Sequence, residues 1–83
     1  MTAAQRMHLE YDDTQPARLF RALRHRSGAW VALPFLVEAR RCGYKVSTRA
    51  SELRRIYGLN VQNKEVRQPD GSIHSFYRLV ETP

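Results

Sequence analysis

Cysteine, glycine and long apolar runs are scarce in this chain, and each scarcity excludes a class of protein. One cysteine among 83 residues cannot form a disulfide within the chain, which excludes a disulfide-stapled scaffold. The longest apolar run, residues 29–37, is broken by Pro34 and is far shorter than the roughly 18 residues of a membrane-spanning helix. Residues 1–10 lack the apolar core of a signal peptide. We therefore expect a cytoplasmic protein without a membrane partner.

Residues that perform catalysis or hold metals are equally sparse. The three histidines are far apart and share no ligand spacing with Cys42 or with a pair of carboxylates, so we expect no metal site. The four glycines form no phosphate-binding loop, and no serine, threonine or cysteine occupies a nucleophile motif. The sequence therefore predicts a protein that is not an enzyme and needs no cofactor.

Positive charge is what the chain has in excess, and it is concentrated in the middle. Lys and Arg number 14 against 8 Asp and Glu, a net charge of +6. Residues 15–58 hold ten of these bases and only two acids, a net of +8, whereas residues 1–14 carry −2 and residues 59–83 are neutral. Twelve of the bases are arginines, whose planar guanidinium suits phosphates and guanine edges. Such a chain is typical of one small, basic domain that binds nucleic acid.

An acidic arm should precede the first helix. Residues 1–14 end in Asp and Thr breakers, so we expect a flexible arm. We hypothesise that its acids fold back on the basic face led by Arg49 and Arg55. Thr14 is a candidate N-cap for a helix that begins near Pro16, because proline is tolerated in the first turn. The pair Ser27-Gly28 should end that helix.

Two further helices are expected in the basic segment. The second should open at Leu33-Pro34 and stop near Cys42-Gly43, because glycine favours the left-handed position after a helix. The third, capped by Ser47 or Thr48, should run to about Tyr57. Apolar residues at helical spacing give it a buried stripe.

The last third of the chain predicts a β-hairpin. The sequence Gln68-Pro69-Asp70-Gly71 favours a tight turn, since each residue type suits its turn position. A turn there pairs Val61 with Leu79 and Asn63 with Tyr77, and it sends Val61, Tyr77 and Leu79 to one face, toward the helices.

The order helix, short strand, helix, turn, helix and long hairpin is that of a winged helix-turn-helix, an α+β fold. Residues 15–83 would form this domain, with three helices and a C-terminal hairpin wing from Val61 to Leu79. The short strand is expected around Trp30, whose side chain is assigned to the core because a lone tryptophan between helices is usually buried.

Three stretches resemble one known family. Residues 46–55, Val-Ser-Thr-Arg-Ala-Ser-Glu-Leu-Arg-Arg, look like the recognition helix of small winged helix-turn-helix proteins of phages, prophages and mobile elements, in which an arginine starts the helix and a Glu-Leu-Arg triplet follows. Residues 57–63 resemble the glycine-led entry into their wing, and residues 75–79 resemble their closing strand, which ends in Tyr-Arg-Leu. The resemblance covers roughly residues 17–80 and departs at Ala50, where the family usually has a larger aliphatic. It implies DNA binding in transcription regulation or mobile-element housekeeping.

In that fold the third helix would enter the major groove of double-stranded DNA, and the wing would lie on the backbone or in the minor groove. Candidates for contacts from the third helix are Thr48, Arg49, Ser51, Glu52 and Arg55, although Glu52 could instead orient one of the two arginines. Candidates for phosphate contacts around the turn and near the wing tip are Arg40, Arg41, Lys45, Lys64 and Arg67. Arg54 would contact DNA, or it would pack against the wing or against an acid.

Two other functions stay open at the level of sequence. The chain could be a protein-interaction adaptor that uses a winged helix without DNA, because fold does not fix function. It could also bind RNA, although the expected contact face has few aromatic residues for stacking single strands. A homodimer or a protein partner is compatible with either function.

Overall fold

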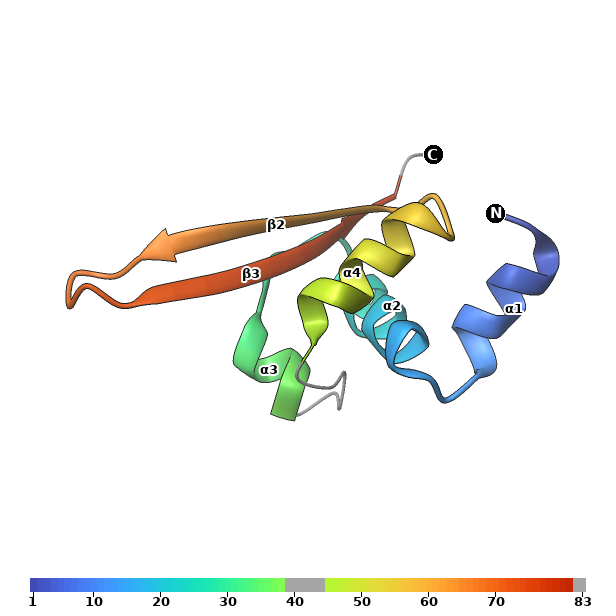
Figure 1. Ribbon diagram of the computed structural model, residues 1–83, viewed down its shortest axis with the longest axis horizontal. Coiled ribbons are helices and arrows are strands. Elements are labelled where there is room, and N and C mark those ends of the chain that lie inside the picture. Colours follow the sequence, from blue (N-terminus) through green and yellow to red (C-terminus); the bar gives the residue numbers. More distant parts are fainter. Residues whose placement is uncertain (39–44, 82–83) are drawn as a thin grey trace.

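The computed structural model describes residues 1–38 and 45–81 and is shown in Figure 1. This part of the chain is a small α+β fold with four helices and a three-stranded antiparallel sheet. The elements in chain order are α1 (Ala3–Tyr11), α2 (Gln15–His25), β1 (Val31–Ala32), α3 (Leu33–Glu38), α4 (Val46–Arg55), β2 (Asn60–Arg67) and β3 (Ile73–Val80). No helix in these ranges has the length and apolarity needed to cross a membrane.

The N-terminal segment is a helix, where the sequence suggested an arm without regular structure. The hydroxyl of Thr2 accepts a hydrogen bond from the Gln5 N–H, and the Gln5 side chain accepts one from the Thr2 N–H, which together form a capping box. Leu9 is fully buried in the common core, and α1 packs against α2. The fold therefore has one helix more than the three predicted, because α1 gains its stability from this packing.

The starts of α2 and α3 and the short strand β1 confirm the sequence predictions. The Thr14 hydroxyl accepts a hydrogen bond from the Ala17 N–H at 3.3 Å, with proline in the first turn of α2. After this helix Ser27 and Gly28 both have positive φ, 53° and 87°, which turns the chain toward β1. The predicted end of the second helix, at Cys42-Gly43, lies outside the described residues.

Helix α4 occupies Val46–Arg55, so the predicted range Thr48–Tyr57 is wrong by two residues at each end. Lys45 is the N-cap and makes no side-chain capping hydrogen bond. Val46, Ala50 and Leu53 are all buried, and their spacing of four and then three residues forms one helical stripe. Burial of Val46 therefore sets the start of the helix in place of a serine or threonine cap.

The hairpin has the predicted register. Val61 pairs with Leu79 and Asn63 with Tyr77, and the sheet order is β1-β3-β2. Val61, Tyr77 and Leu79 are buried against the helices, whereas the turn end of the hairpin extends beyond the helical body (Figure 1). The sheet thus has an inner face on the core and an outer face turned away from it.

Trp30 is not a core residue, contrary to the prediction. Its neighbour Val31 pairs with Tyr77 on the inner face, so Trp30 lies on the outer face beside Arg78. The side chain is half-buried, and the Arg78 Cζ lies 4.4 Å from its ring centroid. The alternation of the strand therefore places this ring on the outer face of the sheet, outside the core.

Candidate nucleic-acid interface

The exposed side of α4 lies opposite its buried stripe. Lys45, Thr48 and Arg55 are exposed, and Ser51 is half-buried. Because Val46, Ala50 and Leu53 hold the helix against the core, these polar side chains are the ones that α4 can present to a partner. Four of the six residues predicted on or beside the third helix therefore share one accessible surface.

Arg49 and Glu52, the other two, bind each other. The Arg49 Nη1 donates to the Glu52 Oε1 at 2.5 Å, and the two side chains are only 25% and 21% exposed. The Arg49 Nε is buried and has no hydrogen-bond partner in the described parts of the chain. A contact between Arg49 and a base would require this ion pair to open.

Arg54 joins α4 to the hairpin. Its Nε donates to the carbonyl oxygen of Val61 at 2.6 Å, and its Nη2 donates to the Oδ1 of Asn63 at 3.2 Å. The structure has Arg54 packed against the wing and not against an acid of the described residues. The side chain fixes the orientation of helix and hairpin relative to each other.

On the hairpin, Lys64 and Arg67 are both exposed, but they do not point to one face. Residues 64 and 67 differ by an odd number, and alternate residues of a strand face opposite sides. Lys64 lies over the rings of Trp30 and Phe76 on the outer face. The sequence predicted Lys64 near the wing tip and on the same hairpin face as Phe76, but it did not predict Trp30 beside them, because that position depends on the pairing between β1 and β3.

Two acids of the N-terminal segment pair with arginines of α2, and no ion pair in the described ranges joins this segment to α4. Arg18 pairs with Asp13 at 2.6 Å, and Arg24 pairs with Glu10 at 2.8 Å. The hydrogen bond from Arg24 holds the pKa of the Glu10 carboxyl below its usual value, with burial acting in the opposite direction. The hypothesis that these acids fold back on the third helix is therefore wrong.

Cations without a carboxylate partner in the described ranges include Arg21 and Arg26 of the helical body, and others lie on α4 and the hairpin. Within residues 1–38 and 45–81, no ion pair involves Lys45, Arg55 or Arg67. Arg40 and Arg41, the remaining predicted phosphate contacts, lie outside the described residues. Part of the positive charge of the middle segment is thus exposed on and beside α4.

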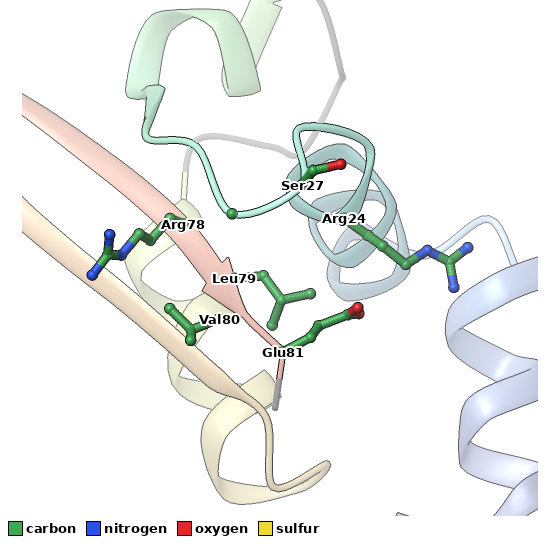
Figure 2. Close-up of a pocket in the computed structure, with 7 residues that line it drawn as sticks. Arg24, Ser27, Arg78, Leu79, Val80 and Glu81 are labelled. Carbon is green, nitrogen blue, oxygen red and sulfur yellow. The ribbon is translucent and has the colours of Figure 1, made fainter. Parts of the chain in front are cut away.

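A pocket of about 640 Å³ opens between the end of α2 and β3. Arg24 and Arg78 both line it, but Figure 2 shows their guanidinium groups directed away from each other and out of the pocket. Leu79 and Val80 lie between them. Because ligand sites gather polar groups toward a common centre, the candidate interface is not placed in this pocket.

Among the described residues, no group of three His, Cys, Asp or Glu side chains could hold a metal ion. Comparison with known proteins adds no assignment, since no family model, curated protein or solved structure matches the chain. The candidate interface therefore rests on its own geometry and charge.

Proposed function

We propose that the chain is a winged helix-turn-helix domain that binds double-stranded DNA, with α4 in the major groove and the β2–β3 hairpin on the backbone or in the minor groove. The order of elements from α2 to β3 supports this proposal, as does the sheet order β1-β3-β2. The resemblance of residues 17–80 to phage and mobile-element regulators favours a role in transcription or mobile-element regulation.

One observation carries the proposal: Arg18 and Arg24 of α2 are paired with acids and Arg21 donates to backbone carbonyls, whereas the exposed side chains of Lys45, Arg55 and Arg67 lack a carboxylate partner in the described ranges. Charge left without a counter-ion on the protein attracts phosphates, and these contacts release the cations condensed on DNA. The B-DNA major groove is wide enough to admit a helix such as α4. Arg54 supports the same geometry because it fixes that helix to the wing.

The side chains of α4 differ in how readily they could contact DNA. Thr48, Ser51 and Arg55 are available to bases and phosphates, whereas Arg49 and Glu52 first have to separate. We therefore assign initial capture to Arg55 with Lys45 and Arg67, and later base reading to Arg49.

A matched pair of variants tests the proposed interface. Arg55→Gln and Arg18→Gln each remove one positive charge, but Arg55 is exposed on α4, whereas Arg18 pairs with Asp13. Arg55→Gln should weaken binding to a labelled duplex several-fold and reduce the salt slope by about 1, and Arg18→Gln should change neither. Equal losses for both variants would mean that only net charge matters, and no loss for either would exclude α4 as the contact surface.

A further inference from the structure

The outer face of the sheet carries aromatic rings and cations but no acid. Alternate residues of a strand share a face, and Phe76 pairs with Ala32 on one side and Lys64 on the other. The adjacent row holds Trp30, Arg78 and Gln62, since Gln62 pairs with Arg78. The other outer-face residues of β2 and β3 are Asn60, Val66, His74 and Val80. This face therefore has no carboxylate of its own to neutralise Lys64 or Arg78.

The two cations of the outer face rest on aromatic rings. The Lys64 Nζ lies 4.5 Å from the ring centroid of Trp30 and 5.7 Å from that of Phe76. The Arg78 Cζ lies 4.4 Å from the Trp30 centroid, and its Nε donates to the Gln62 Oε1 at 2.8 Å. No ion pair involves either cation in the described parts of the chain. Both charges are therefore held beside half-exposed rings, where an anion can reach them.

We propose that this face binds single-stranded nucleic acid, with an unpaired base stacked on Trp30 or Phe76 and the flanking phosphates on Lys64 and Arg78. Stacking of a base on an aromatic side chain is stronger than a cation–π contact at an exposed site. An incoming base therefore displaces the cation from the ring, and the cation moves to a neighbouring phosphate. An acidic peptide would use the cations but leave the rings without a stacking partner.

This site is separate from the proposed duplex interface. A base in a double helix is stacked on its neighbours and has no free face for Trp30. The bases of a single strand are not held in this way, and each can stack on an aromatic ring. The outer face also lies on the side of the sheet turned away from the helices, so α4 does not contribute to it. Because stacking does not depend on base identity, the site should accept most sequences.

Trp30 is the only tryptophan of the chain and reports directly on its own site. The full chain is titrated at low salt with an oligothymidylate or an oligouridylate of roughly ten nucleotides while tryptophan emission is followed. We expect saturable quenching that weakens with added salt, and the stronger of the two ligands identifies DNA or RNA as the polymer. Emission that stays constant when either strand is in large excess overturns the proposal.

Variants then test whether Trp30 and Lys64 contact the single strand. Trp30→Ala should weaken binding of a labelled strand by at least about fivefold in anisotropy, and Lys64→Ala should weaken both binding and quenching. Arg6→Ala, which removes one exposed positive charge from α1, is the control and should leave single-strand binding unchanged. Lys64 is exposed, so its variant keeps the test valid even if Trp30→Ala fails to fold. Full affinity in folded Lys64→Ala, or equal quenching by a duplex, contradicts the proposal.

Discussion

Arg54 on α4 and Val61 on β2 are joined by a hydrogen bond of 2.6 Å from the arginine Nε to the valine carbonyl oxygen. The same side chain donates to Asn63, so one arginine ties the helix to the hairpin at two successive inner-face positions of β2. Arg55, the next residue, is exposed and takes part in no ion pair of the described chain. The two neighbouring arginines therefore differ in role. Arg54 fixes the orientation of α4 relative to the hairpin, and Arg55 adds an exposed positive charge to α4.

Arg54→Ala should lower the free energy of unfolding by about 1.5–3 kcal/mol, because it removes charge-assisted hydrogen bonds from a partly buried carbonyl. Arg55→Ala should change that free energy by less than about 0.5 kcal/mol, as is usual for an exposed site. Urea denaturation measures the free energy of unfolding of both variants. Equal stability losses would show that the link between α4 and β2 is not structural.

Leu9→Ala should destabilise the fold by about 2–5 kcal/mol, because Leu9 is fully buried and its loss leaves a cavity beneath α1. Met7→Ala on the same helix is the control, and it should cost less than about 0.5 kcal/mol because Met7 is 61% exposed. Thermal or urea unfolding compares the two. A Leu9→Ala protein as stable as the wild type would mean that α1 does not belong to the cooperative core.

Glu52→Gln should increase the affinity for duplex DNA, because it removes the carboxylate that holds Arg49. Glu65→Gln on the hairpin makes the same change of charge without releasing an arginine, so it measures the general electrostatic gain. The gain from Glu52→Gln should exceed that from Glu65→Gln in fluorescence anisotropy. A loss of affinity would instead show that Glu52 orients Arg49 for DNA.

Glu10 should make stability depend on pH on the acid side. Its pKa in the fold lies below the usual value of 4.5, so its contribution is present above that pH and is lost as pH falls toward the lowered pKa. Glu10→Gln should therefore reduce the urea midpoint at about pH 7, and this reduction should shrink as the pH falls below 4.5. Glu65→Gln serves as the charge-matched control. A Glu10→Gln effect that grows on acidification would reverse the assigned sign.

The hairpin could be predicted from sequence because its register is local. Proline, aspartate and glycine define the turn at residues 69–71, and the pairing of Val61 with Leu79 follows by counting outward. Thr14 as the cap of α2 is local in the same way. Such features depend on a few neighbouring residues and need no knowledge of the rest of the fold.

Structural features that depend on contacts between distant parts of the chain could not be predicted from the sequence. The nine residues of α1 form too short a helix to be stable alone, so its existence depends on Leu9 packing into the core. Trp30 reaches the outer face because a two-residue strand pairs with β3, more than forty positions later in the chain. The ion pair of Arg49 with Glu52 is by contrast local, and the sequence left it open as an alternative to a DNA contact by Glu52.

The salt dependence of duplex binding tests the proposed DNA interface most directly. If about six phosphates are neutralised, the logarithm of the binding constant should fall with the logarithm of salt concentration at a slope of about −5. The double variant Lys45→Ala/Arg55→Ala should make that slope less steep by about 2, because it removes two of the contacting charges. Absence of binding to a random duplex at low salt, or a slope near zero, would contradict the proposed interface.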